Sequence, residues 1–183
     1  MLAGCGAGRQ KAVSERFAFP PGARQIGVGP AFHPHARARR VPDCRPRLGR
    51  RYGAHVELFA ANRVVLVPAG IGVGRPMHVA GAKVVRARCY GAFVTLDPTG
   101  TVAVRPGTRV TLGDLFEQWG AALRPHRLVG FAAPAPGRVR AYVAGRRVAG
   151  DPRRIVLSPH AEVVLEVGPF VPPHHSYAFP GGL

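Results

Sequence analysis

Apolar and polar residues alternate along the middle of the chain in short runs that predict β-strands. Residues 55–59 and 64–67 form two such runs, and residues 61–63 between them have the composition of a tight turn. A second extended stretch over residues 82–104 turns at residues 97–100, which are Asp-Pro-Thr-Gly. These patterns predict two β-hairpins.

Two further extended segments lie near the C-terminal end of the chain. Residues 139–143 alternate between apolar and polar types, and residues 144–147 have a turn-forming composition. Residues 162–167, which are Glu-Val-Val-Leu-Glu-Val, predict a last strand. Together these segments predict a third hairpin.

One helix is predicted, and it begins after Thr111. Thr111 and Asp114 match the capping-box spacing, in which each side chain binds the backbone N–H of the other residue. Leu115 and Trp119 follow at i and i+4, and Gly120 is a typical helix end. Because a helix this short is unstable alone in water, we expect its apolar face to pack on a sheet.

The order hairpin, hairpin, helix, hairpin predicts an α+β fold. We expect a small, mostly antiparallel sheet of hairpins with one short helix packed on a face, close to a β-grasp arrangement. This domain is expected over residues 52–171. Repeated prolines and an excess of basic residues predict an extended arm over residues 1–51. Residues 172–183 are expected to form an irregular tail.

The formal net charge of +17 would attract polyanions such as nucleic acids, anionic lipids and acidic wall polymers. Nearly all the 26 basic residues are arginines, in a chain also rich in alanine, glycine and proline. Because all four types have G/C-rich codons, genomic base composition is an alternative source of this charge. The chain has no zinc-finger, helix-turn-helix or RRM signature. We therefore expect that the protein binds no specific nucleic acid. The candidate partners are an anionic component of the cell envelope and a membrane surface.

Residues 2–5, which are Leu-Ala-Gly-Cys, resemble the bacterial lipobox, in which a signal peptidase cleaves before a cysteine that becomes diacylated. The charged and apolar segments of an export signal do not precede them. One hypothesis is that translation begins upstream and that Cys5 carries a lipid anchor outside the cytoplasm. The alternative is a chance match at the start of a cytoplasmic protein.

Apart from Cys5, the chain has two cysteines, Cys44 and Cys89, and they flank the first hairpin. In an oxidising compartment the two residues could form a disulfide, which would stabilise the fold by roughly 4 kcal/mol because it closes a long loop. The alternative is two free, partly buried thiols. Neither cysteine carries the local signature of a catalytic nucleophile.

The nine acidic residues offer few candidates for catalysis. Asp114 is assigned to the helix cap, whereas Asp97 and Asp151 precede prolines in turns. No nucleophile elbow, P-loop or dinucleotide fingerprint occurs in the sequence, so we expect no enzyme. Three glutamates on predicted strands are expected to face solvent and pair with arginines: Glu57, Glu162 and Glu166.

Residues 55–59 are similar to the end of a His-x-His-x-His-Leu motif, and residues 89–100 align without a gap to a Cys-His-x-x-Leu-His-Thr-His-Asp motif. Residues 111–120 and 150–162 match later segments in the same order. On these four segments the chain resembles a family of uncharacterised bacterial secreted or membrane-anchored proteins, over roughly residues 44–183. The resemblance implies a secreted or anchored protein and no particular activity.

Most of the motif histidines of that family are replaced here. In the first motif, Gly53 occupies the position of one histidine and only His55 remains. In the second motif, the histidine positions are occupied by Tyr90, Val94 and Leu96. Alternating histidines on paired strands would place several imidazoles on one side of a sheet, as a zinc or copper site requires. The resemblance thus implies that the family has a metal site and that this chain has lost it. We expect Val94 and Leu96 to make this face part of the hydrophobic core.

Four more histidines are candidates for weak copper or zinc binding. They lie in two proline-rich segments, where exposed histidines are common, and they are His33, His35, His174 and His175.

Three hypotheses for the function remain open. The first is a non-enzymatic cell-envelope domain without a cofactor, anchored at Cys5, with a binding or structural role and a degenerate metal site. The second is a copper- or zinc-binding protein that uses His55 together with other histidines. The third is a cytoplasmic protein that binds polyanions or nucleic acid.

If Cys5 is lipidated, expression from the native locus with its upstream DNA should place the protein in the membrane fraction. Cell fractionation followed by mass spectrometry of the N-terminal peptide measures this, and we expect a lipid-modified Cys5. An unmodified Met1 in the soluble cytoplasm would contradict the anchored form and favour the third hypothesis.

Overall fold

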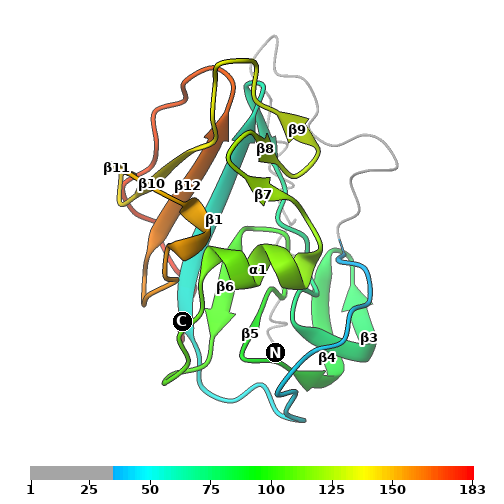
Figure 1. Cartoon of the computed structure of the whole chain (residues 1–183). Helices are drawn as coiled ribbons and strands as arrows, with labels where there is room; N and C mark the ends of the chain where they lie inside the picture. The colour runs from blue at the N-terminus through cyan, green and yellow to red at the C-terminus, as the bar shows by residue number, and fades with distance from the viewer. Residues whose placement is uncertain (1–34) are drawn as a thin grey trace, which may run out of the picture.

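A computed structural model describes residues 35–183, so Cys5 and His33 lie outside the described residues. The largest element is a seven-stranded sheet (Figure 1). Its strands are β1 (Tyr52–Ala60), β2 (Arg63–Val65), β5 (Phe93–Val94), β6 (Thr101–Val104), β10 (Arg140–Val143), β11 (Arg146–Val148) and β12 (Glu162–Val167). They are arranged in the order β11-β10-β12-β1-β6-β5, and β2 pairs with one end of β1.

Within residues 35–183, two smaller sheets, one α-helix and a short 3₁₀ turn complete the fold. They are β3 (Val73–Ala80) with β4 (Lys83–Tyr90), then α1 (Leu112–Trp119), then β7 (Leu123–Arg124), β8 (Arg127–Leu128) and β9 (Phe131–Ala132), and the turn at Pro152–Arg154. The β3–β4 hairpin lies to one side of the main sheet (Figure 1). Among the described residues, no helix has the length and apolar character needed to cross a membrane.

The centre of the main sheet is the parallel pair formed by β1 and β12. In their register His55 lies opposite Glu162, and Leu58 lies opposite Leu165. Strand β6 flanks β1 and strand β10 flanks β12, both antiparallel. Because side chains alternate between the two faces of a strand, one face of this pair is apolar. Its side chains are buried in the main hydrophobic core: Ala54, Val56, Leu58, Ala60, Val163, Leu165 and Val167.

Helix α1 covers this apolar face, as the sequence predicts. The Thr111 side chain accepts a hydrogen bond from the Asp114 N–H, and the Asp114 carboxylate accepts one from the Thr111 N–H, so the capping box is confirmed. Gly120 ends the helix with a φ of 79°, a left-handed conformation that favours glycine. Burial of each large apolar side chain contributes about 1.5–3 kcal/mol. The helix contributes three of them to the core: Leu112, Leu115 and Phe116.

The fold is mostly β, and the predicted α+β, β-grasp-like class was therefore wrong. Strand makes up 39% of the structure and helix 7%. One reason is that β3 and the small β7–β9 sheet form in segments for which the sequence pattern predicts no strand. The other reason is that β12 pairs in parallel with β1 at the centre, so the main sheet is mixed rather than a set of antiparallel hairpins.

The short-range turns agree with the sequence better than the fold class does. Strands β1 and β2 form the first predicted hairpin, and the turn residues Ala61 and Asn62 both have positive φ. Strands β5 and β6 pair across the predicted turn at residues 97–100, and β10 pairs with β11. The first half of the second predicted hairpin was wrong, because β4 pairs with β3. A shift in the register of β3 accommodates Pro76, which cannot donate a ladder hydrogen bond.

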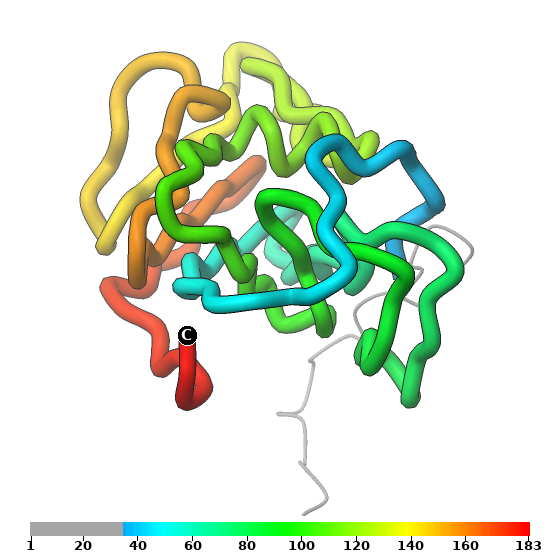
Figure 2. The backbone as a smooth tube through the Cα atoms, turned by 90° about the horizontal axis from the view of Figure 1, so that it is seen from below, coloured from blue at the N-terminus to red at the C-terminus, as the bar shows by residue number. Residues whose placement is uncertain are grey.

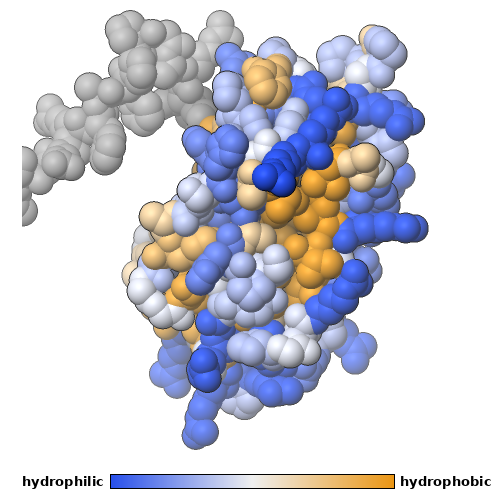
Figure 3. All heavy atoms as spheres, turned by 90° about the vertical axis from the view of Figure 1, so that its left-hand side faces the viewer, coloured by the Kyte–Doolittle hydropathy of each residue, from blue (hydrophilic) through white to orange (hydrophobic). Residues whose placement is uncertain are grey.

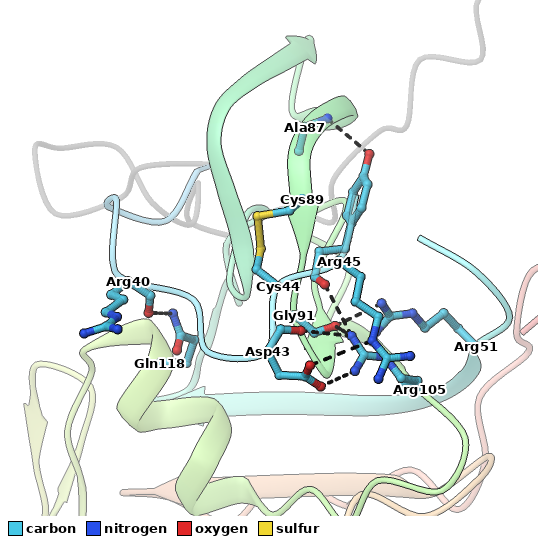
Figure 4. Close-up of a disulfide and its surroundings, with 11 residues drawn as sticks. Arg40, Asp43, Cys44, Arg45, Arg51, Ala87, Cys89, Gly91, Arg105 and Gln118 are labelled. Atoms are coloured by element: carbon cyan, nitrogen blue, oxygen red, sulfur yellow. Dashed lines mark hydrogen bonds and ion pairs between the residues drawn. A yellow bond between two sulfur atoms is a disulfide. The ribbon is translucent and has the colours of Figure 1, made fainter. Parts of the chain in front are cut away.

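The Cys44–Cys89 disulfide ties the segment before β1 to strand β4 (Figure 4), which confirms one of the two alternatives left open for these cysteines. Next to it, the backbones of Arg45 and Tyr90 exchange two hydrogen bonds. Gly74 on β3 lies so close that a Cβ atom there would be 2.4 Å from the Cys89 Sγ. The disulfide therefore packs against β3 as well as joining β4.

Arg51 holds the same segment from its other end. Its side chain is buried and donates hydrogen bonds of 2.9 Å to the carbonyl oxygens of Gly91 and Ala92. Burial lowers the pKa of Arg51 below its ordinary value, and the nearby positive charge of Arg105 lowers it further. Residues 35–51, which the sequence analysis assigns to the arm, are thus fastened to the folded part of the chain.

Removal of the disulfide should lower the free energy of unfolding by about 4 kcal/mol, because a loop with a sequence separation of 45 is then no longer closed in the unfolded chain. The double substitution Cys44→Ser with Cys89→Ser, compared with the oxidised wild type by urea unfolding, measures this loss. Wild-type protein unfolded in the presence of a reductant is the matched control and should behave like the double variant. Equal stability of all three samples would contradict the expectation.

Candidate functional site

The face of the main sheet opposite helix α1 carries a row of polar side chains. On β1 these are His55 and Glu57, and on β12 they are Glu162 and Glu166, which alternate with the core residues. The C-terminal residues 168–183 contain no helix or strand and lie on the side of the sheet away from the helix (Figure 2). The row of polar side chains is therefore enclosed between the sheet and this C-terminal tail.

The glutamates of β12 were expected to face solvent, and that expectation was wrong. The side chains of Glu162 and Glu166 are 1% and 0% exposed. The Arg140 guanidinium donates to Glu166 Oε2 over 3.0 and 3.1 Å. Removing a carboxylate from water costs several kcal/mol unless it is paired, so each buried glutamate needs a cationic or hydrogen-bonding partner.

The partner of Glu162 is His55. His55 Nδ1 lies 2.8 Å from Glu162 Oε2, and His55 Nε2 lies 2.8 Å from the Thr99 carbonyl oxygen. Because a carbonyl can only accept, Nε2 carries a proton that it donates to Thr99. Gly100 lies against the ring as well, since a Cβ atom there would be 3.1 Å from His55 Nε2. The imidazole is therefore fixed, with Nδ1 directed at the carboxylate.

These contacts set the protonation of His55. Burial by itself lowers the pKa of His55, but the hydrogen bond and the charge of Glu162 raise it, as do the Thr99 carbonyl and the charge of Glu57. The net result is a pKa of His55 above its ordinary value of 6.5. The folded protein thus favours the protonated imidazole more strongly than a free histidine does.

The C-terminal tail adds two side chains to the site. The Tyr177 ring stacks on the His55 ring with a centroid distance of 3.6 Å and an interplanar angle of 10°. His174 Nδ1 lies 2.7 and 2.9 Å from the two carboxylate oxygens of Glu57. A chain of alternating histidine and glutamate side chains therefore runs from β12 across β1 to the tail.

Three donor atoms of this cluster lie close enough together to share one ion. One ligand atom each from His55, Glu57 and Glu162 all lie within 4.8 Å of one another. Glu162 Oε1 is buried and has no hydrogen-bond partner within residues 35–183. A cavity of about 380 Å³ opens beside the cluster and is lined in part by His55, Glu57, Thr99, His174 and Tyr177.

The remaining sequence-predicted residues lie elsewhere. His35 is bridged to Ala69 and lines a different cavity, and His175 packs on the turn at Gly145. Neither one is among the residues that line the cavity beside His55. Val94 and Leu96 belong to a second apolar cluster, which is the core role that the sequence predicts for them.

Sequence reasoning missed Glu57, Glu162 and Tyr177 as members of the site. One signal for Glu57 was present, because it lies two positions after His55 along a strand and residues i and i+2 share a face. No local signal indicates Glu162 or Tyr177, since both reach His55 through contacts between distant parts of the chain.

A second candidate site is a groove beside the disulfide, here called the arginine groove. It has a volume of about 590 Å³, and Cys44, Cys89 and Gly74 form part of its wall. Among the described residues that line it, none is acidic and none is aromatic. It is lined by four exposed arginines: Arg39, Arg40, Arg75 and Arg88.

Comparison with known proteins adds no assignment to either site. The chain matches no known family, no curated protein and no solved structure. The resemblance to secreted or anchored bacterial proteins therefore stays a prediction.

The raised pKa of His55 has a consequence for stability. Because the folded-state pKa exceeds the unfolded one, this stabilisation is complete below the unfolded pKa of about 6.5 and is lost as pH rises through the folded-state value. We expect His55→Gln to remove this fall in stability with rising pH. Urea unfolding over a pH series, with the exposed His160→Gln as control, measures it. Parallel pH profiles for His55→Gln and wild type would contradict the expectation.

Proposed function

We propose that this chain is a non-catalytic cell-envelope domain that binds phosphate-bearing polyanions outside the cytoplasm. The observation that carries the proposal is the position of the Cys44–Cys89 disulfide in the wall of the arginine groove. Disulfides persist in oxidising compartments and are rare in the cytosol. The lipobox-like residues before Cys5 and the family resemblance support the same location.

The arginine groove has the chemistry of a phosphate site. A guanidinium presents several N–H donors in one plane, which match two oxygens of a phosphate. Arg39 and Arg75 each donate a 2.9 Å hydrogen bond to a backbone carbonyl, that of Glu117 and that of Ala36. These bonds orient two of the four guanidinium groups without neutralising their charge.

The charge of the whole molecule favours an extended anion over a small one. With a formal net charge of +17, association with a polyanion is attractive over a distance of several ångström and weakens as salt rises. Single-stranded nucleic acids are commonly bound by stacking of bases on aromatic side chains. Since none of the described residues that line the groove is aromatic, we favour the phosphate backbone of an envelope polymer or the headgroups of anionic lipids.

The test compares two pairs of substitutions that lower the net charge equally. Arg40→Gln with Arg88→Gln removes two groove arginines, and Arg146→Gln with Arg147→Gln removes two exposed arginines of β11. Strand β11 lies on the side of the molecule away from the β3–β4 hairpin (Figure 1), and on the surface of that side hydrophilic residues border an apolar strip (Figure 3). The second pair is therefore a control for charge alone.

We expect the groove pair to weaken binding to phosphatidylglycerol vesicles about 30-fold, since each arginine near an anionic surface contributes about 1 kcal/mol. The control pair should change affinity by a few-fold at most, and phosphatidylcholine vesicles should not bind. Soluble polyphosphate titrated without vesicles should bind as tightly as the vesicles if the source of the phosphate is a polymer, and much more weakly if it is a lipid surface. An equal loss of vesicle affinity for both pairs would show that the attraction is diffuse, and it would contradict a specific role for the arginine groove. Reduced cysteines in protein recovered from its native compartment would contradict the location.

A further inference from the structure

We infer that the histidine–glutamate cluster under the C-terminal tail is a binding site for one divalent transition-metal ion of the zinc type. The ligands are His55 Nδ1, one carboxylate oxygen each from Glu57 and Glu162, and His174 from the tail. This site is separate from the arginine groove and does not depend on the proposed function.

The orientation of His55 is the first argument. A histidine that binds a metal through one ring nitrogen usually donates its other N–H to a carbonyl or carboxylate, which fixes the ring. His55 Nε2 donates to the Thr99 carbonyl, and this leaves Nδ1 directed at Glu162. The neutral ring with its proton on Nε2 has its lone pair on Nδ1, where a metal needs it.

The donor spacing is the second argument. Zinc binds nitrogen and oxygen ligands at about 2.0–2.2 Å, so tetrahedral ligands lie roughly 3.3 Å apart. The donor atoms of His55, Glu57 and Glu162 already lie within 4.8 Å of one another, and those of His55 and Glu162 are 2.8 Å apart. Small side-chain movements are enough to place all three around one ion, which replaces the proton between His55 and Glu162.

The unsatisfied carboxylate is the third argument. Glu162 has a side chain that is 1% exposed, and its Oε1 has no hydrogen-bond partner within residues 35–183. A buried polar atom without a partner costs free energy, so such an atom calls for an explanation, for example an ion. A metal bound to this carboxylate would satisfy it.

The tail supplies the fourth ligand and access to the site. His174 is held 2.7 Å from Glu57 and its side chain is 64% exposed, so it can turn toward an ion without breaking the fold. The cavity beside the cluster is lined by His174 as well as by His55. Metal binding should therefore fasten the tail to the sheet.

The test uses the oxidised full-length chain after removal of metals with a chelator. Titration with Zn²⁺ against a chromophoric competitor should give one tight site per chain. Loss of an outer-shell partner already costs about 10–100-fold in metal affinity, so we expect Glu57→Gln and His174→Ala each to weaken this site by at least about 100-fold. Both side chains are partly exposed, which protects the fold of these variants. His175→Ala, next in the chain, is the matched control and should bind as the wild type does.

A second readout follows the tail itself. Chymotrypsin should cleave after Tyr177 more slowly when Zn²⁺ is bound, and the protection should vanish in His174→Ala. Absence of a tight site in the wild type would overturn the inference. So would unchanged affinity in both Glu57→Gln and His174→Ala, because zinc would then bind other histidines of the chain. Arg40→Gln with Arg88→Gln should leave zinc affinity unchanged, which separates this test from that of the arginine groove.

Discussion

The parallel pairing of β1 with β12 is the constraint on which both faces of the main sheet depend. The register that sets His55 opposite Glu162 also sets Leu58 opposite Leu165 in the core. A slip by one residue would turn the carboxylates of β12 into the apolar core and its three core side chains toward the polar row. Because an unpaired buried carboxylate costs several kcal/mol, the core and the polar row select the same register.

The two faces of the sheet are covered by different means. Helix α1 covers the apolar face through buried side chains and caps that its own sequence provides. The C-terminal tail contains no helix or strand, so side-chain contacts hold it in place. Tyr177 stacks on His55, His174 contacts Glu57, and the Arg140 guanidinium donates a 2.9 Å hydrogen bond to the carbonyl of Gly168 where the tail begins. Its order therefore depends on the polar row beneath it.

Features set by neighbouring residues could be predicted from the sequence, and features set by distant contacts could not. The helix, its caps and the tight turns depend on a few consecutive residues, and the limits of the last strand agree with residues 162–167. The parallel partner of that strand lies about a hundred residues away, and no local pattern indicates it. The same holds for the burial of Glu162, since an alternating strand looks identical whether water or a tail covers its polar face. Pro76 concealed β3, because proline in a strand pattern normally argues against a strand.

The β3–β4 hairpin makes oxidation matter for more than stability. It forms its own two-stranded sheet, an arrangement that is marginal in isolation, and Val79 and Val85 on it are 45% and 58% exposed. The disulfide and the adjoining Arg45–Tyr90 bonds hold this hairpin against the body of the protein. Without them, its strand edges and exposed valines are free to pair with another copy of the chain. The disulfide thus also limits self-association through the edges of this hairpin.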